Sequence, residues 1–435
     1  MTAKEETQAA ANTEETAESQ NTSETAAEKK GKGKVIGLIS AVVLIIVAAA
    51  LLIWGRNMSG ASTSDSSSKD ANNLFSNGLA AVMDSNGKWG YIDKSGSYVI
   101  NAQFDAVGAF EDNGLALVRV GDGETGKYGY INKSGEYVID PQFDYARNFS
   151  NGLVCVKSGD KWGYIDVTGK YVINPQFDGA SSFAKNGLAL VSVDNKCGYI
   201  DKTGKYVIDP QFERANSFDD TGFAVVMDSN KMWGYIDKTG KYVINPQFNR
   251  AYSFSDDGLA FVKCGELYGY IDKTGTYVIN PQYDEVGYFS EKRASVRVGN
   301  KYGIIDENGK YVVDLQLDYS DVQYKFSNGY AAVKMNDKYG YIDVDGNFVI
   351  NPQFDFAFDF MNNDIACVRI SGRSGYIDKT GKYIINPQFN LASKFYDDGY
   401  AWAQVEDKWG IIDEKGNYVV DPQFSDYNSL ANIPS

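Results

Sequence analysis

Histidine is absent from this chain of 435 residues, and basic side chains are outnumbered by acidic ones. Without imidazole there is no Ser-His-Asp or Cys-His catalytic arrangement and no histidine metal ligand. The 42 Lys and Arg residues stand against 57 Asp and Glu residues, which gives a net charge of −15. Because phosphate binding needs a basic face, we expect no nucleic-acid partner.

Cysteine is scarce as well, since the chain has only four. That number is too small for a scaffold held together by disulfides, and we interpret the four as small buried hydrophobic residues. A disulfide in an exported domain stays open as an alternative, with no pairing readable from the sequence.

Aromatic residues make up 14% of the chain, yet apart from Trp54 they all lie at or beyond Phe75. Residues 1–34 have none and are predicted to form a disordered cytoplasmic tail. Residues 35–54 are uncharged (VIGLISAVVLIIVAAALLIW), long enough at about 1.5 Å per residue to cross a bilayer. We predict an uncleaved transmembrane helix, with a cleaved signal peptide as the alternative.

Lysines set the expected orientation of this span. Four of them cluster before it, at positions 29, 30, 32 and 34, whereas only Arg56 follows closely. The positive-inside rule then places the N-terminus in the cytoplasm and the rest of the chain outside. Residues 55–74, rich in Ser, Asn, Asp and Gly, are predicted to be a flexible linker. Residues 75–435 would form an extracytoplasmic domain of a single-pass cell-membrane protein.

From Phe75 onward the chain repeats a unit of about 35 residues. Each unit is marked by a central glycine, and neighbouring glycines lie 34 to 39 residues apart. Ten units are marked in this way, by Gly90, Gly129, Gly163, Gly198, Gly234, Gly269, Gly303, Gly340, Gly375 and Gly410. A period of this length, repeated ten times, indicates a repeat architecture.

Each unit has the pattern of β structure. Runs such as Gly114–Val118, Trp162–Asp166 and Tyr171–Ile173 are short, apolar and rich in aromatic and β-branched residues. The last two runs are joined by Asp-x-x-Gly in nine units, which predicts a hairpin with an Asx-type turn and a left-handed glycine. One Asp per turn does not supply the converging oxygens of a calcium loop, so no metal or cofactor is expected.

The clearest copy runs from Trp233 to Phe248, WGYIDKTGKYVINPQF. This unit resembles the bacterial WG-repeat family, and the resemblance covers residues 75–430. The signature Trp is present at 89, 162, 233 and 409; Tyr stands at 128, 268, 302 and 339, Cys at 197 and Ser at 374. The resemblance implies a family whose members share no common enzymatic activity. It also implies repeats that often occur on secreted or membrane-anchored chains.

Two architectures fit an all-β protein of ten such units. An open β array or superhelix packs each unit only on its neighbours, whereas a closed propeller usually has four strands and about 40 or more residues per blade. Each unit has three recognisable strands rather than four, which favours the open array. One observation favours closure: the repeats begin mid-unit at Phe75 and end mid-unit at Leu430, so the last segment could complete the first unit.

Tyrosine recurs directly after the central glycine and is the candidate ligand-binding row. This row consists of Tyr91, Tyr130, Tyr164, Tyr199, Tyr235, Tyr270, Tyr341 and Tyr376. Exposed, such rings would suit sugar faces or a partner protein; the alternative is that they pack between successive units. A second series follows the turn, at Tyr98, Tyr137, Tyr171, Tyr206, Tyr242, Tyr277, Tyr311, Tyr383 and Tyr418.

The repeated acids are turn aspartates, equivalent in every unit, so no catalytic residue is expected and the protein is predicted not to be an enzyme. The leading functional hypothesis is a binding or scaffolding module for cell-wall glycan or an envelope protein. A structural spacer or adhesin without a ligand pocket is the second hypothesis. A surface glycan hydrolase is the third and is disfavoured, because a catalytic carboxylate pair should interrupt the repeat.

Overall fold

The computed structural model describes residues 73–121, 125–319 and 324–427. All described residues belong to one unit of the chain, Gly55–Ser435. Residues 1–54, with the predicted transmembrane helix 35–54, lie outside the described residues, as does most of the predicted linker. Within the described residues, no helix is long and apolar enough to span a membrane.

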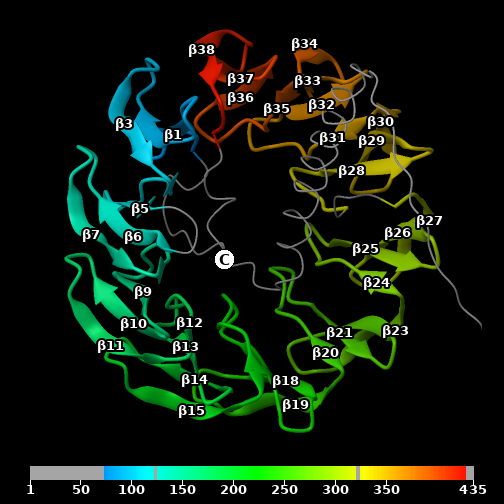
Figure 1. Ribbon diagram of the computed structural model, residues 1–435. Helices are drawn as coiled ribbons and strands as arrows, with labels where there is room; N and C mark the ends of the chain where they lie inside the picture. Colours follow the sequence, from blue (N-terminus) through cyan, green and yellow to red (C-terminus); the bar gives the residue numbers. More distant parts are fainter. Residues whose placement is uncertain (1–72, 122–124, 320–323, 428–435) are drawn as a thin grey trace, which may run out of the picture. The chain divides into compact units, whose positions relative to one another are not determined.

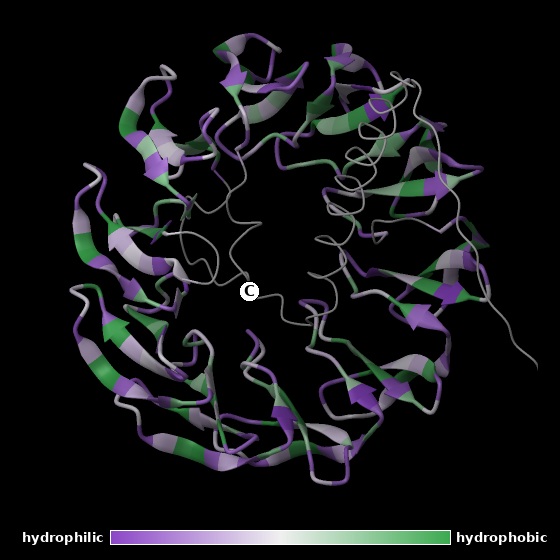
Figure 2. Ribbon diagram, viewed as in Figure 1, coloured by the Kyte–Doolittle hydropathy of each residue, from purple (hydrophilic) through white to green (hydrophobic). Residues whose placement is uncertain are grey.

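The described residues form a closed ring of ten antiparallel sheets, the blades of a β-propeller (Figure 1). We number the blades 1 to 10 along the chain. Eight sheets run from a short inner strand through a second and a third strand to an outer strand, in chain order, and the two sheets β1-β2-β3 and β28-β29-β30 have the last three of these strands. Figure 2 shows hydrophobic and hydrophilic residues interspersed along the strands. Second and third strands such as β17 and β2 are buried throughout, as expected for sheets covered on both faces, whereas the outer strands alternate buried and exposed residues.

The inner strands have two residues each. They are β4 (Ala106–Val107), β8 (Tyr145–Ala146), β12 (Gly179–Ala180), β16 (Arg214–Ala215), β20 (Arg250–Ala251), β24 (Glu285–Val286), β31 (Phe356–Ala357) and β35 (Leu391–Ala392). The second strands are β1 (Ala80–Met83), β5 (Ala116–Val120), β9 (Leu153–Ser158), β13 (Ala189–Val193), β17 (Ala224–Met227), β21 (Ala260–Cys264), β25 (Arg293–Val298), β28 (Tyr330–Met335), β32 (Ala366–Ile370) and β36 (Tyr400–Val405).

The third strands carry the signature glycine. They are β2 (Trp89–Ile92), β6 (Lys127–Ile131), β10 (Lys161–Asp166), β14 (Lys196–Ile200), β18 (Trp233–Ile236), β22 (Leu267–Ile271), β26 (Lys301–Asp306), β29 (Lys338–Asp343), β33 (Arg373–Ile377) and β37 (Lys408–Asp413). The outer strands are β3 (Tyr98–Phe104), β7 (Tyr137–Phe143), β11 (Tyr171–Phe177), β15 (Tyr206–Phe212), β19 (Tyr242–Phe248), β23 (Tyr277–Tyr283), β27 (Tyr311–Leu317), β30 (Phe348–Phe354), β34 (Tyr383–Phe389) and β38 (Tyr418–Phe424).

The predicted hairpin turn is confirmed. In blade 5, the Asp237 side chain accepts hydrogen bonds from the backbone N–H groups of Thr239 and Lys241, at 2.8 and 3.2 Å. Gly240 has φ of +85° and donates its N–H to the Asp237 carbonyl at 2.9 Å. An L-residue would be strained at this φ, which explains the glycine that ends each Asp-x-x-Gly turn.

Glycine is needed at the signature position for a different reason, because a side chain would not fit there. The outer strand bends across the third strand, and their register shifts at this point. A Cβ added to Gly234 would lie 2.6 Å from the carbonyl oxygen of Ile244 and 2.7 Å from the nitrogen of Pro246. Since backbone atoms cannot move aside as a flexible side chain does, only glycine lets the two strands cross this closely.

The preference for an open array is wrong, because the ring closes. The C-terminal segment fills the inner-strand position of blade 1: Ser425 donates its N–H to the Met83 carbonyl at 3.0 Å, and Met83 donates to the Asp426 carbonyl at 2.9 Å. Asp105 and Arg119 pair in the same way in blade 2, at 2.9 Å. The last unit therefore completes the first.

Hydrophobic packing gives a second sign of closure. Buried residues form ten clusters, each built from two adjacent blades. An open row of ten units would have only nine interfaces. The tenth cluster joins Phe75 and Val82 of blade 1 to Trp402 and Phe424 of blade 10. Physically, closure removes the two uncovered blade faces that an open array would leave exposed.

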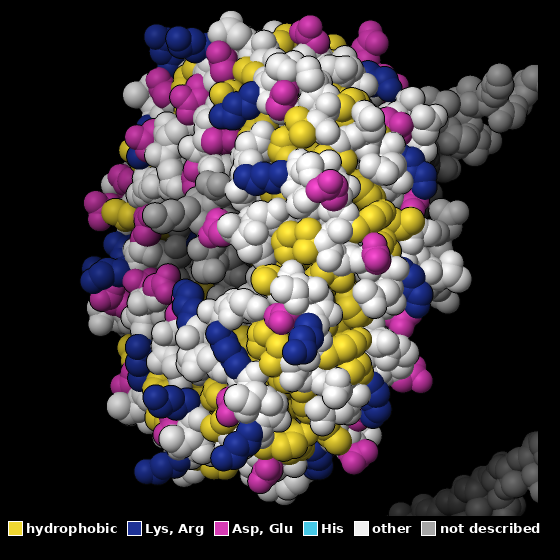
Figure 3. Space-filling model, turned by 90° about the vertical axis from the view of Figure 1, so that its left-hand side faces the viewer, with side chains coloured by type: hydrophobic (Ala, Val, Ile, Leu, Met, Phe, Trp, Pro, Cys, Tyr) yellow, Lys and Arg dark blue, Asp and Glu magenta, His cyan; other side chains and the backbone are white. Residues whose placement is uncertain are grey.

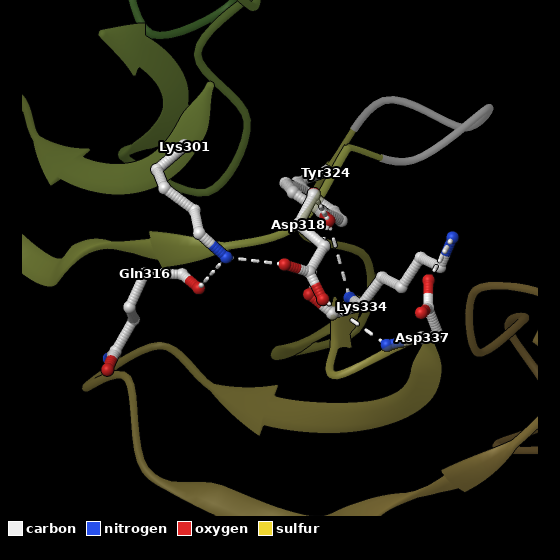
Figure 4. A network of polar contacts seen from close by, with 6 residues as sticks. All are labelled: Lys301, Gln316, Asp318, Tyr324, Lys334 and Asp337. Carbon is white, nitrogen blue, oxygen red and sulfur yellow. Dashed lines mark hydrogen bonds and ion pairs between the residues drawn. The ribbon is translucent and has the colours of Figure 1, made fainter. Parts of the chain in front are cut away.

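The junction of blades 7 and 8 departs from the repeat, because Leu315 and Leu317 stand where most units have proline and an aromatic residue. Asp318 lies at its centre (Figure 4). Its carboxylate accepts hydrogen bonds from Lys301 Nζ at 2.5 Å and from the backbone N–H of Asp337 at 3.2 Å, and the Tyr324 hydroxyl donates to its carbonyl. These contacts tie β27 and the hairpin between β28 and β29 across the irregular segment.

Candidate functional site

The predicted tyrosine row lies inside the ring rather than on its surface. All eight residues are at most 1% exposed. They are Tyr91, Tyr130, Tyr164, Tyr199, Tyr235, Tyr270, Tyr341 and Tyr376. Burial raises the pKa of each hydroxyl well above its ordinary value, so the hydroxyls remain protonated hydrogen-bond donors.

Each of these hydroxyls is already used by the fold. Tyr235 donates to the carbonyl of Tyr252, 17 residues on in the next blade, at 2.8 Å. The other seven make the same bond to the residue 17 positions on, over 2.6 to 2.8 Å. Each ring also packs against a phenylalanine of the next blade, for example Tyr235 on Phe254 with centroids 5.1 Å apart. The row therefore joins neighbouring blades and offers no ring face to a ligand.

The second tyrosine series lies on the outer strands, at the rim of the ring. Tyr98, Tyr137 and Tyr418 are 39 to 43% exposed. Tyr137 meets Phe104 of the preceding blade edge to face, with centroids 6.3 Å apart. Tyr98 meets Phe424 of blade 10 in the same way at 6.1 Å, which continues the pattern across the closure. Three of the five exposed aromatic residues in the described part of the chain therefore belong to this series, and the other two are Tyr319 and Phe358.

The outer strands expose further side chains in a fixed order. In all ten, the third and seventh residues are buried and the fourth and sixth are exposed. The sixth residue is always Gln, and the fourth is Asn or Asp. The second residue is an exposed Val or Ile in eight strands. Each blade thus presents an aromatic ring, an aliphatic side chain and two polar groups.

These rim residues lie on the outer strands of neighbouring blades. Space-filling atoms show a hydrophobic band along the side of the ring that carries the outer strands (Figure 3). The exposed aliphatic residues of the outer strands are Val99, Val138, Val172, Val207, Val243, Val278, Val349 and Ile384. We call the exposed Tyr, Val or Ile, Asn or Asp, and Gln of the outer strands the rim surface. Exposed apolar surface of this extent is typical of an interaction site.

Proline in the outer strands limits β-strand pairing at the rim surface. Each outer strand is an edge strand whose backbone could pair with another chain. In eight strands the fifth residue is Pro, which removes a donor and blocks regular pairing. The rim surface therefore presents side chains rather than a backbone edge open to an added β-strand.

Lysine–carboxylate pairs recur at the hairpin between the second and third strands. The acid lies 17 residues after the lysine in Lys88–Asp105, Lys127–Asp144, Lys161–Asp178, Lys196–Glu213, Lys301–Asp318 and Lys338–Asp355. The same acid holds the hairpin, as when Asp144 accepts the Gly159 N–H at 2.7 Å. These carboxylates are used by the fold and are not grouped for chemistry.

In the described part of the chain, two carboxyl groups have raised pKa values. Burial raises the pKa of Glu111 to about 7 and that of Asp359 to about 6. They come from blades 2 and 9, which are not neighbours, so they do not form a general acid–base pair. All four cysteines are free: Cys155 and Cys367 are buried, Cys197 is half-buried and Cys264 is exposed.

Comparison with known protein families shows the family to which the chain belongs. The family model described as "WG containing repeat" matches ten times, at residues 89–123, 128–162, 162–197, 198–231, 233–268, 268–302, 302–339, 339–373, 375–409 and 409–432. The chain belongs to the WG-repeat family. The resemblance seen in the sequence is thereby confirmed, and its ten units are the ten blades of the WG-repeat ring. No curated protein matches the chain.

Solved structures give only distant likenesses. A eukaryotic initiation factor matches with 11% identity and a TM-score of 0.48, over 80% of this chain and 96% of its own. BamB from Moraxella catarrhalis matches with 12% identity and a TM-score of 0.32, over 70% and 91%. Because both TM-scores are below 0.5, neither likeness bears on the function of the WG-repeat ring.

Proposed function

We propose that the WG-repeat ring is a binding module whose rim surface holds a repetitive ligand at the cell surface. Cell-wall glycan is the first candidate for this ligand, and an envelope protein is the second. The observation that carries the proposal is the repetition of one exposed set of side chains on the outer strands, with Gln at the same place in all ten.

The chemistry of the rim surface suits a glycan. Sugar rings present apolar C–H faces and hydroxyl groups, which match an aromatic or aliphatic surface beside amides that both donate and accept hydrogen bonds. A single blade offers few such contacts, so its own affinity would be weak. A polymer that reaches several blades gains from effective concentration, and avidity of about 10²–10⁴-fold follows without any new kind of contact.

Membrane anchoring is a separate part of the proposal. The uncharged run 35–54 and the lysines before it support a single span with the N-terminus in the cytoplasm and the ring outside. Protease added to intact cells should then degrade the ring and spare the first 34 residues. Survival of the ring under conditions that digest other surface proteins would contradict this orientation.

The binding proposal is tested by sedimenting the purified full-length chain with insoluble cell wall, with and without soluble glycan. Saturable binding that soluble glycan displaces is expected. The triple variant Val172→Ser, Val207→Ser and Val243→Ser alters three neighbouring blades at exposed positions and should weaken binding by about 10-fold or more.

The matched control replaces three exposed turn lysines by serine, Lys133, Lys238 and Lys273. It removes more charge than the valine variant but leaves the rim surface intact. Equal loss in both variants would indicate nonspecific attraction. Binding that glycan does not displace would favour an envelope protein, and no binding at all would favour a spacer.

A further inference from the structure

In blade 4, small side chains stand at positions that larger side chains occupy in other blades of the ring. In every blade with four strands, four residues that face one another across neighbouring strands form a row from the inner to the outer strand. One residue of this row stands at the signature position. In blade 3 the row is Tyr145, Lys157, Trp162 and Phe177. In blade 4 it is Gly179, Ser192, Cys197 and Phe212. Blade 4 thus has three small residues where blade 3 has three large ones.

These small side chains leave an open recess of about 570 Å³ between blades 4 and 5. Ser192, Asn195 and Cys197 line it from blade 4. From blade 5 it is lined by Glu213, Arg214, Met227 and Lys231. A volume of this size lies within the usual range of ligand pockets.

Blade 9 shows that a small signature residue alone does not open the ring. There the signature position is Ser374, and its row contains Phe356 and Arg369. These large neighbours cover the serine, which is only 4% exposed. In blade 4 the inner-strand residue and the second-strand residue are small as well, so nothing in the row replaces the missing indole.

Cys197 and Met227 supply the apolar part of the recess lining, beside polar and charged side chains. Cys197 is half-buried, and burial raises the pKa of its thiol, which is therefore neutral at pH 7. Met227 is 8% exposed and contributes a thioether from the facing blade. Thiol and thioether sulfur atoms pack favourably against aromatic rings.

The mouth of the recess carries excess positive charge in a chain of net charge −15. Glu213 accepts hydrogen bonds from Lys196 at 2.6 Å and Lys231 at 2.7 Å, and these two contacts lower its pKa to about 2. Arg214 is exposed and forms no ion pair within the part of the chain that is described. Its guanidinium is therefore available to a carboxylate.

We propose that this recess binds an aromatic ring that carries a carboxylate, with the ring in the place that Trp162 fills in blade 3. Cys197 and Met227 contact the ring, and Arg214 binds the carboxylate. The ligand is either a free aromatic acid or the C-terminal aromatic residue of a peptide, since both present the same groups. This site is independent of the rim surface, and it stands or falls without glycan binding.

Titration calorimetry of the full-length chain tests the proposal with three probes: indole-3-acetate, indole, and the peptide Gly-Gly-Trp. Indole-3-acetate or the peptide should bind once per chain with a Kd of about 0.1–1 mM, given the size of such ligands. Indole should bind about 5–10-fold more weakly because it lacks the carboxylate. Tighter binding of the peptide would identify a protein C-terminus as the source, and tighter binding of indole-3-acetate a free acid.

Three variants locate the site. Cys197→Trp restores the signature residue and should abolish binding. If this variant does not fold, Ser192→Lys is a second way to fill the recess, because blade 3 has a lysine at this place. Arg214→Gln should weaken the carboxylate probes by about 5–10-fold and leave indole unchanged. Arg250→Gln changes the equivalent exposed inner-strand arginine of blade 6 and is the matched control.

The proposal is overturned if none of the probes binds the unaltered chain. It is also overturned if a folded variant with a filled recess binds as well as the unaltered chain, or if Arg250→Gln weakens binding as much as Arg214→Gln.

Discussion

Replacing Tyr427 by alanine should destabilise the whole ring, because this residue holds the closure between blades 10 and 1. Its ring stacks on Trp402 with centroids 4.8 Å apart and an interplanar angle of 21°. It also meets Trp409 edge to face at 4.6 Å and 66°. The backbone just before it forms the two hydrogen bonds that complete blade 1.

The expected magnitude follows from these contacts. Removing a fully buried aromatic side chain costs about 3–5 kcal/mol, and each aromatic pair adds about 0.5–1.5 kcal/mol beyond the buried area. Tyr427 is half-buried rather than fully buried, so we expect a loss of about 2–4 kcal/mol. The control is Tyr418→Ala on β38 of blade 10, which removes a ring that is 42% exposed and should cost about 1 kcal/mol.

Urea unfolding followed by circular dichroism measures both variants without relying on the tryptophans that Tyr427 contacts. The closed ring predicts that Tyr427→Ala lowers the free energy of unfolding at least twice as much as Tyr418→Ala. In an open array, Tyr427 would lie at a frayed end, and its loss would cost less than about 0.5 kcal/mol. That result would refute the closure.

Three further predictions concern single residues within the ring. Tyr235→Phe removes the bond to the carbonyl of the next blade and should cost about 1–2 kcal/mol in urea unfolding, whereas Tyr206→Phe at the rim should cost almost nothing. Gly234→Ala places a Cβ 2.6 Å from a backbone oxygen and should cost about 3 kcal/mol or prevent folding; Gly265→Ala, with φ of +61° but no atom within 4 Å, should cost about 1 kcal/mol. The raised pKa of Glu111, about 7, means that the folded state binds more protons than the unfolded state between pH 4.5 and 7. Stability should therefore fall as pH rises through this window, by up to about 2–3 kcal/mol, and thermal melting of Glu111→Gln should show a smaller slope.

The sequence predicted the repeat, three of the four strands in each unit and the hairpin turn, because each of these has a local signal. Strands such as Trp233–Ile236 are aromatic and β-branched, and the turn residues Asp237 and Gly240 have specific backbone roles. The inner strand escaped prediction because it is only two residues long, for example Arg214–Ala215. Without this fourth strand, the unit looked too small for a blade, and the open array was favoured.

The two tyrosine series could not be told apart by composition, because each repeats once per unit. What separates them is the neighbouring blade: it covers Tyr235 completely, whereas it leaves Tyr137 two-fifths exposed. A local signal was present. Tyr235 stands among apolar residues in WGYI, whereas Tyr137 follows a polar turn at the start of an outer strand. The rim glutamines also gave a signal, since a polar residue that recurs in all ten units has no role in a core.

Hydroxyl-radical footprinting of the full-length chain, with and without soluble cell-wall glycan, tests the role of the rim surface most directly. Without glycan, the rim residues Tyr137, Val172 and Val207 should be oxidised, and the buried Tyr235 should not. Saturating glycan should lower oxidation of the three rim residues at least several-fold and leave Tyr235 unchanged. Unchanged oxidation at the rim while glycan is bound would contradict the account, because the ligand would then occupy another surface of the ring.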